Sequence, residues 1–458
     1  MRKLQEKYPS IFKAYDVRGI YGDDITEETA YRIGNAFGSF IGNKGIVNVG
    51  RDTRKGSSDL SKFVISGLLN SGCDVLDLGK VPSPILYYST TKTCSTAGVI
   101  ITASHLPPEW NGFKFCDNHG QVISEGNGLE YIRNAYLQEN SQIHQKGTLN
   151  TYSKILEDYY DSVKTGIKCI RQNFKVTIDT SNSVPSLFLP KLFNKIGINS
   201  IFINDKILEI PVHDVEPGLY SMEMLREFVI KTDSDIGIMY DSDGDRIAFV
   251  SEDGKIYPDG VVLIAIFSII FSQKFKKGSV VLDVTCPSSL SDYIKRCGFT
   301  PLISKVGHNF CSSMALKNKS LFAAQFSGHI SLMESDYRDD AIYANLKLLE
   351  FVSKLDEPLS EFISKNIPKF YYETTSLEVQ DSMKFTLMKR IIKNLKEKEK
   401  QFLELDGIKV IHSEGSYLIR PSNTSNIIRI MAEGKNQESM DKMMKIAIKE
   451  TQDVMNND

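Results

Sequence analysis

The sequence has no hydrophobic run long enough to cross a bilayer. Its longest apolar stretch, "VVLIAIFSIIF", covers residues 261–271, whereas a membrane-spanning helix needs ~20 such residues. Residues 1–16, "MRKLQEKYPSIFKAYD", also lack the apolar segment of a secretory signal. We therefore expect a cytoplasmic protein with no membrane partner, in which residues 261–271 form a core helix.

Paired cysteines of the C-x-x-C type are also absent. The 7 cysteines are scattered along the chain and odd in number. This distribution argues against a secreted protein held by a disulfide framework and indicates a reducing compartment.

The chain carries little excess charge of either sign. Lys and Arg together number 55 and Asp and Glu 57, so the formal net charge is −2, and no long basic block occurs. Nucleic acid is therefore not an expected partner, and an anionic ligand must be bound by local charge.

What the sequence does contain is one pattern used three times within 458 residues, a length of about three or four domains. Each copy has a β-branched strand, a segment of helical period that ends near a glycine, and a second strand, as expected for a βαβ unit. The copies cover residues 45–79, 174–205 and 278–308. Their wide spacing favours separate α/β domains, although many single α/β domains also repeat this unit.

The last part of the chain has a different pattern. From about Tyr371 it predicts a strand, a Lys-rich helix over 382–399, three further strands and an amphipathic helix over 437–455. Strands grouped beside two helices indicate an α+β domain. With joints near 150, 254 and 368, the predicted domains are residues 1–150, 151–254, 255–367 and 368–458.

The stretch "YDSDGDRIAFV" (240–250) places three carboxylates at alternate positions, Asp241, Asp243 and Asp245. Crowded hard oxygen ligands suit Mg²⁺ or Ca²⁺. An EF-hand does not fit, because Arg246 stands where that loop requires glycine and residues 247–251 read as a strand. The remaining alternative is a solvated acidic turn.

A second loop, "TASHLPPEWNGFK" (102–114), follows the apolar strand "AGVII". It combines Ser104, His105, the only tryptophan (Trp110) and Lys114. A loop that only had to reverse the chain would not need a hydroxyl, an imidazole and an amine so close together.

Other polar loops are less distinctive by themselves. "LIRPSNTSNIIRI" (418–430) offers guanidinium, hydroxyl and amide groups that suit a phosphate dianion, or it is an ordinary hairpin turn. "KVGHNF" (305–310) and "AAQFSGHISL" (323–332) could bind a polyol or supply an acid or base, although a lone histidine is more often structural. "FKAYDVRGIYG" (12–22) and the basic "GRDTRKGSS" (50–58) could equally be surface loops.

Taken in order, these motifs resemble the α-D-phosphohexomutase family of phosphomannomutases, phosphoglucomutases and phosphoglucosamine mutases. The resemblance rests on "YDVRG", "GRDTR", "TASH-P---NG-K", "D-DGDR", "VGH", "SGH" and "RPSNT", and covers nearly the whole chain. It implies three similar mixed α/β domains and a C-terminal α+β domain around a central cleft.

The resemblance also implies a reaction and its residues. Ser104 matches the serine that carries the transferable phosphate, and Asp241, Asp243 and Asp245 match the ligands that hold one Mg²⁺ with it. The other expected catalytic residues are Arg18, His105, Lys114, Arg246, His308 and His329. The expected substrate-binding residues are Tyr15, Lys305, Gly307, Gln325, Ser327, Arg420, Ser422, Asn423, Thr424 and Arg429.

Several positions depart from the family pattern. Leu106 replaces an Asn in the loop that carries Ser104 (102–114, the serine loop). Leu cannot hydrogen-bond through its side chain, which predicts weaker support for that loop. Gln325 replaces a Glu in the loop at 323–332, which matches the sugar-binding loop of the family (the sugar loop). The amide keeps one acceptor oxygen but loses the charge. Thr285 stands where a basic residue is frequent, and Ser242 where Gly or Ala is usual.

Three hypotheses therefore stand. The first is an active hexose-phosphate mutase for mannose or glucose phosphates, with a hexose 1,6-bisphosphate as intermediate and activator, acting as a monomer or homodimer. The second is a mutase for another sugar phosphate, such as an amino sugar or a pentose. The third is a non-catalytic phosphosugar-binding descendant. Intact metal aspartates beside altered sugar contacts favour the second over the third.

Overall fold

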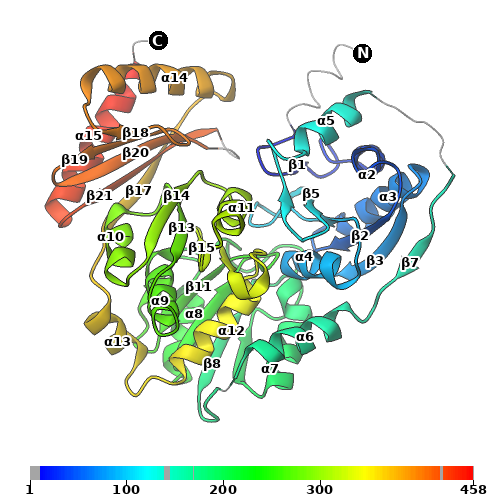
Figure 1. Cartoon of the computed structure of the whole chain (residues 1–458), viewed down its shortest axis with the longest axis horizontal. Helices are drawn as coiled ribbons and strands as arrows, with labels where there is room; N and C mark the ends of the chain where they lie inside the picture. The colour runs from blue at the N-terminus through cyan, green and yellow to red at the C-terminus, as the bar shows by residue number, and fades with distance from the viewer. Residues whose placement is uncertain (1–10, 139–144, 169, 423–425, 457–458) are drawn as a thin grey trace. The chain divides into compact units, whose positions relative to one another are not determined.

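The structure is a computed structural model that describes residues 11–138, 145–168, 170–422 and 426–456. The chain forms two compact units (Figure 1). The first unit comprises the chain up to Leu263 together with Ser327–Ile363. The second comprises Ile264–Phe326 together with the chain from Ser364 onward.

The first unit opens with a mixed sheet. Four of its strands run parallel and the strands at one side run antiparallel, in the order β1 (Val17–Ile20), β5 (Trp110–Asp117), β4 (Ala97–Ile101), β2 (Ile46–Arg51), β3 (Asp74–Lys80) and β7 (Leu149–Thr151). A short strand, β6 (Val122–Ile123), pairs with β5. The serine loop is the connection between the antiparallel pair β4 and β5.

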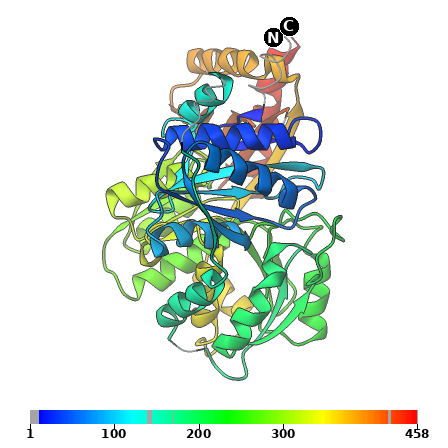
Figure 2. The ribbon, with the colours of Figure 1, turned by 90° about the vertical axis from the view of Figure 1, so that its right-hand side faces the viewer.

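Helices cover both faces of this sheet. Helices α2 (Glu27–Phe40) and α3 (Ser57–Asn70) lie side by side on one face (Figure 2). Because strand side chains alternate between faces, Val99 and Ile101 join the core under these helices, whereas a Cβ at Gly98 would approach Leu86 of α4 (Ser83–Lys92) to 3.3 Å. The result is an α/β/α layer structure.

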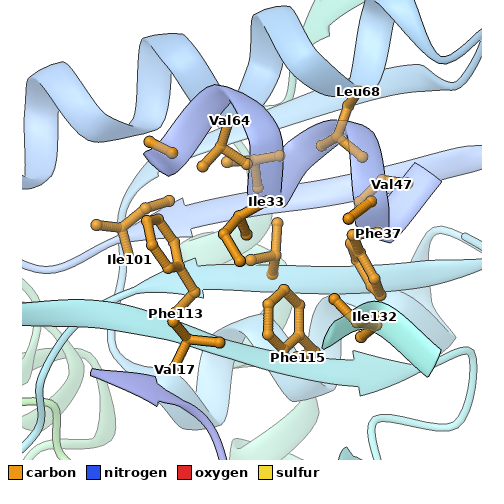
Figure 3. Packing of buried hydrophobic residues seen from close by; sticks show 14 of the residues in the cluster. Val17, Ile33, Phe37, Val47, Val64, Leu68, Ile101, Phe113, Phe115 and Ile132 are labelled. Atoms are coloured by element: carbon orange, nitrogen blue, oxygen red, sulfur yellow. The ribbon is translucent and has the colours of Figure 1, made fainter. Parts of the chain in front are cut away.

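The core of this domain is aromatic and β-branched. Figure 3 shows Ile33 and Phe37 of α2 and Val64 of α3 packed onto Phe113 and Phe115 of β5. Phe37 and Phe115 have ring centroids 4.8 Å apart. Helix α5 (Leu129–Gln138) adds Ile132 to the same core. This rigid core fixes both ends of the serine loop.

A second mixed sheet completes the first unit. Its strands follow the order β12 (Ile256–Tyr257), β11 (Ile247–Ser251), β10 (Ile236–Tyr240), β8 (Lys175–Asp179) and β9 (Asn199–Ile203). The helices associated with it are α6 (Ile155–Gly166), α7 (Leu189–Ile196) and α8 (Glu223–Lys231). The unit also contains β16 (Ile330–Leu332), α12 (Ala341–Val352) and the part of α13 (Leu359–Asn366) up to Ile363.

The second unit contains a parallel and an antiparallel sheet. In the parallel sheet β14 (Thr300–Ser304), β13 (Ser279–Asp283) and β15 (Phe322–Ala324) are neighbours, with α10 (Ser288–Arg296) and α11 (His308–Asn318) between them in sequence. The antiparallel sheet follows the order β17 (Tyr371–Glu378), β21 (Ile427–Gly434), β20 (Gly415–Pro421), β19 (Ile408–His412) and β18 (Phe402–Leu403). Helices α14 (Asp381–Lys398) and α15 (Gln437–Met455) accompany it.

The three predicted βαβ units are confirmed, because β2–β3, β8–β9 and β13–β14 are parallel pairs. Gly72, Gly197 and Gly298 have φ values of 96°, 83° and 92° at the ends of the intervening helices, the left-handed conformation that glycine adopts most readily. The α+β pattern of the C-terminal part is confirmed as well. Within that C-terminal part, the two-residue strand β18 was not predicted.

The apolar run at residues 261–271 forms α9 (Gly260–Ser272), whose side chains are largely buried, as predicted. Within the described ranges, no helix is both long and apolar enough to span a membrane. The cysteines at 73, 94, 116, 286, 297 and 311 are free thiols, and Cys169 lies outside the described residues.

Candidate active site

The three aspartates occupy the tight connection between the antiparallel strands β10 and β11. Asp241 follows directly after β10, and the left-handed Gly244 (φ 74°) lets the chain reverse. All three carboxylates are fully buried, and their ligand atoms lie within 4.8 Å of one another. Their burial excludes the alternative of a solvated acidic turn.

Mutual repulsion in this cluster is balanced by a buried lysine from β5. Burial raises the pKa of Asp241 well above its usual range, and Asp245 and Asp243 raise it further. Lys114 Nζ lies 2.6 Å from Asp243 Oδ2 and 2.7 Å from Asp245 Oδ2. Burial alone lowers the pKa of Lys114, but these two carboxylates outweigh it and hold that pKa well above its ordinary value.

Ser104 faces the cluster from the β4–β5 loop. Its Oγ donates to Asp241 Oδ2 at 3.2 Å, and its backbone N–H donates to Thr102 Oγ1 at 2.9 Å. Its φ is 51°, a left-handed conformation uncommon for a residue with a side chain. Such conformations persist only where the surroundings impose them, and they concentrate at functional sites.

Arg54 imposes this conformation. It belongs to the basic loop at residues 50–58, which the sequence alone does not distinguish from a surface loop. Its side chain is 9% exposed. The guanidinium donates to four carbonyl oxygens of the serine loop, those of Ser104, Leu106, Pro107 and Trp110. These acceptors are main-chain atoms, so the Leu106 side chain does not remove this support.

Ser242 lies in the connection between β10 and β11 that carries the three aspartates (the metal loop), and it also contacts the serine loop. Its hydroxyl donates to the Ser104 carbonyl and accepts from Arg54 at 3.3 Å. A Gly or Ala at position 242 would lack this oxygen. The departure therefore adds a direct hydrogen bond between the metal loop and the serine loop.

Histidine side chains also lie near this centre. His105 Nδ1 is 3.4 Å from Ser104 Oγ. Burial lowers the pKa of His105 well below its usual value, with Arg246, Arg18 and Lys114 acting in the same direction, so the ring is neutral.

His329 is held at both ring nitrogens. Its Nδ1 lies 2.6 Å from Asp339 Oδ2, and its Nε2 accepts from Arg246 Nε at 2.9 Å. Burial lowers its pKa to about 3. The neighbours assign the proton to Nδ1. Arg246 in turn pairs with Glu216 at 3.1 Å.

The N-terminal candidates approach from β1. Arg18 is buried and pairs with Asp16 at 2.6 Å, while Tyr15 precedes the strand and is half-buried. Arg18 is among the charges that lower the pKa of His105. Ser327 and His329 belong to the same compact unit as these residues.

The second unit contains the other sugar-loop candidates. Gln325 is buried, and its amide N–H donates to Cys311 Sγ at 3.4 Å. His308 is the first residue of α11, after Gly307 and Lys305. Thr285 donates to Asp283, whose other oxygen accepts from the Phe326 N–H at 3.3 Å.

The predicted phosphate grip lies in the hairpin between β20 and β21. Arg420 is buried and bonded to Asp406 at 2.9 Å, and it stands directly opposite the exposed Arg429 in the strand register. Like charges facing each other are unfavourable without an anion between or beside them. Ser422 is buried, while Asn423 and Thr424 lie outside the described residues.

The carboxylate cluster meets the requirements of a magnesium site. Its donors are all hard oxygens in a confined space. Asp243 Oδ1 is buried and has no hydrogen-bond partner among the described residues. A divalent cation would relieve the repulsion that raises the pKa of Asp241. Residues Asp241, Asp243 and Asp245 would hold it, with Ser104 beside them.

Comparison with known families agrees along the whole chain. Residues 9–142 match phosphoglucomutase/phosphomannomutase, alpha/beta/alpha domain I; residues 157–254 match domain II; residues 257–370 match domain III; and residues 376–449 match the C-terminal domain.

Similar proteins carry related names. The phosphomannomutase/phosphoglucomutase of Pseudomonas syringae pv. tomato is 31% identical over 95% of this chain and 93% of its own length. A probable phosphoglucosamine mutase of Pyrococcus abyssi is 30% identical over 97% and 98%. The crystal structure of a phosphoglucomutase/phosphomannomutase family protein from Burkholderia thailandensis superposes with a TM-score of 0.87, at 25% identity over 97% and 98% of the two chains. The chain is therefore a member of the phosphoglucomutase/phosphomannomutase family, a family of phosphohexomutase enzymes.

Proposed function

We propose that this protein is a hexose-phosphate mutase that interconverts hexose 1-phosphate and hexose 6-phosphate, with mannose or glucose as the sugar. The observation that carries the proposal is Ser104, held in a left-handed conformation with its Oγ 3.2 Å from Asp241 in a buried carboxylate cluster. Full-length identity of about 30% to phosphomannomutase/phosphoglucomutases supports the same reaction.

Ser104 carries the transferable phosphate in this proposal. Phosphoryl transfer depends mainly on positioning and on neutralising spread negative charge. Mg²⁺ bound by Asp241, Asp243 and Asp245 would supply part of that neutralisation. Lys114 supplies a positive charge in the same place, fixed by two ion pairs.

Of His105 and His329, His105 is the better placed to move a proton at the reacting oxygen. A base must be unprotonated and within hydrogen-bond reach. His105 is neutral and borders Ser104 Oγ. Both ring nitrogens of His329 have partners, so we assign His329 to orienting Arg246. Arg18 and Arg246 contribute charge around the reacting phosphate.

The hairpin with Arg420, Ser422 and Arg429 is the proposed grip for the non-reacting phosphate, together with Asn423 and Thr424. Guanidinium groups bind phosphate oxygens in pairs. A grip that recognises only a phosphate accepts the substrate in either orientation. A hexose 1,6-bisphosphate intermediate can thus present each end to Ser104 in turn, and added bisphosphate would activate dephosphorylated enzyme.

Tyr15, Lys305, Gly307, His308, Gln325 and Ser327 complete the proposed sugar and phosphate contacts. We further propose the four domains 1–150, 151–254, 255–367 and 368–458, and a cytoplasmic monomer or homodimer. The free thiols suit a reducing compartment.

The decisive test is a coupled mutase assay with Mg²⁺ and a trace of hexose bisphosphate. Glucose, mannose and glucosamine 1-phosphates and ribose 1-phosphate are compared. We expect turnover of the hexose phosphates that chelation with EDTA abolishes. Turnover of only glucosamine or ribose phosphate would replace the proposed substrate, and folded protein without turnover or phosphoserine would indicate a binding protein.

One observation favours the alternative of a mutase for another sugar phosphate, such as an amino sugar or a pentose. Gln325 offers a neutral amide, with its N–H turned toward Cys311. We expect Gln325→Glu to raise kcat/KM for glucose or mannose phosphates roughly fivefold, because a charged acceptor strengthens a hydrogen bond by about 1 kcal/mol. Steady-state kinetics on each sugar phosphate measures this. No gain on any hexose would make Gln325 a feature of a different substrate.

Trp110 provides an optical signal for binding. It is the only tryptophan, half-buried, and its carbonyl is bonded to Arg54 in the serine loop. We expect its fluorescence to change on titration with glucose 1,6-bisphosphate and to saturate. Titration with glucose, which carries no phosphate, is the control and should leave the emission unchanged.

A further inference from the structure

The two carboxylate oxygens of Asp243 have unlike surroundings. Oδ2 accepts from Ser83 Oγ at 2.6 Å and from Lys114 Nζ at 2.6 Å. Oδ1 is buried and has no hydrogen-bond partner among the described residues. Leaving a buried acceptor unpaired is unfavourable. Oδ1 is therefore the oxygen of this carboxylate that is available to a cation.

Ser83 contacts Asp243 at two points. Besides the hydroxyl bond, its backbone N–H donates to the Asp243 carbonyl at 3.0 Å. Ser83 is the first residue of α4 and is fully buried, between Pro82 and Pro84. The proline at the helix start and the buried position leave the side chain little freedom. A fixed donor of this kind can select between two oxygens.

The segment before α4 packs directly on the metal loop. A Cβ built at Gly244 would lie 3.3 Å from Pro82 Cβ. The N-terminal end of α4 also presents the positive pole of the helix dipole to the carboxylate. Ser83 and Asp243, 160 residues apart in the chain, thus form one rigid contact between two domains of the first unit.

We propose that Ser83 is a positioning residue for the metal site: by occupying Asp243 Oδ2 it reserves Oδ1 for the divalent cation and so sets the affinity of the cluster. The inference rests on the proposed magnesium site. Lys114 binds the same Oδ2, but its positive charge opposes a cation nearby. Ser83 is a neutral donor, so it orients the carboxylate without that repulsion.

Metal binding in the absence of substrate tests this directly. Mn²⁺ replaces Mg²⁺ as the probe, and free Mn²⁺ is followed by electron paramagnetic resonance during titration of the full chain. We expect Ser83→Ala to raise the Mn²⁺ dissociation constant about tenfold, since residues that orient metal ligands contribute this much to affinity. Ser83→Thr, which keeps the hydroxyl, should restore binding.

Ser89→Ala is the matched control. Ser89 is a buried serine of the same helix whose hydroxyl bonds to the Leu86 carbonyl at 2.6 Å and not to the metal loop. We expect it to bind Mn²⁺ as the parent does. Parental affinity in Ser83→Ala, or an equal loss in Ser89→Ala, would overturn the inference.

Two further outcomes are informative. If Ser83→Ala does not fold, Ser83→Cys retains the size with a weaker donor, and unchanged Mn²⁺ affinity in that variant would reject the positioning role. A parent protein that binds no Mn²⁺ would reject it too. A parent that binds Mn²⁺ through Ser83 but turns over no sugar phosphate would leave this inference standing and defeat only the proposed function.

Discussion

Replacing Ser104 with alanine should abolish turnover while leaving the fold intact. We expect kcat/KM to fall at least about a thousandfold, or ~4 kcal/mol of transition-state stabilisation, because no other group can carry the phosphate. The main-chain contacts of residue 104, to Thr102 and Arg54, do not use the hydroxyl and remain in the variant. The coupled assay and circular dichroism measure the two effects.

Phosphate incorporation separates the proposed chemistry from a general loss of activity. Parent protein treated with glucose 1,6-bisphosphate should gain one phosphate by intact mass spectrometry, and Ser104→Ala none. Ser61→Ala is a suitable control, because Ser61 is a buried serine of α3 that bonds to the Ser58 carbonyl at 2.9 Å. A Ser104→Ala enzyme that keeps most of its rate would exclude the phosphoserine mechanism.

The Asp243→Asn variant should lose at least about a hundredfold in Mg²⁺-dependent activity. The reason is the orientation imposed on the new amide. Ser83 and Lys114 both donate to Oδ2, so the amide oxygen takes that side. The amide nitrogen then occupies the place of Oδ1, and an NH₂ group is a donor that cannot bind a hard cation.

Activity measured across a range of Mg²⁺ concentrations checks this expectation. The loss should persist at high Mg²⁺, or recover only partly, if the nitrogen faces the metal. Asp233→Asn is matched for charge on an exposed residue elsewhere in the same domain, and should behave as the parent. Undiminished catalysis by Asp243→Asn, or catalysis independent of metal, would remove the aspartate from the metal site.

The elements and several site loops could be predicted because their signals are local. A β-branched strand, a helix of 3.6-residue period and a glycine in the left-handed region lie within about thirty residues, so each βαβ unit is legible in the sequence. The same holds for Asp241, Asp243 and Asp245, which share one hairpin. Arg246 at the position that requires glycine, together with the following strand, was sufficient to exclude an EF-hand.

The supporting residues could not be predicted in this way. Ser83 lies in no motif, and its bond to Asp243 joins positions 160 apart. Arg54 was visible only as a basic loop, since nothing local indicates that its guanidinium turns inward to four carbonyls. The contact between Cys311 and Gln325 forms only once the chain has folded. Such pairings depend on how segments that are distant in the sequence pack together, and a local pattern carries no information about that packing.

The way Arg54 is bonded has a consequence for how this enzyme can change over evolutionary time. Its acceptors in the serine loop are peptide carbonyls, and every amino acid supplies one. Mutations within that loop can therefore alter the chemical character of the surface around Ser104 while the backbone path stays the same. A lineage can drift in substrate preference through these side chains, whereas replacing Arg54 would remove all four hydrogen bonds at once.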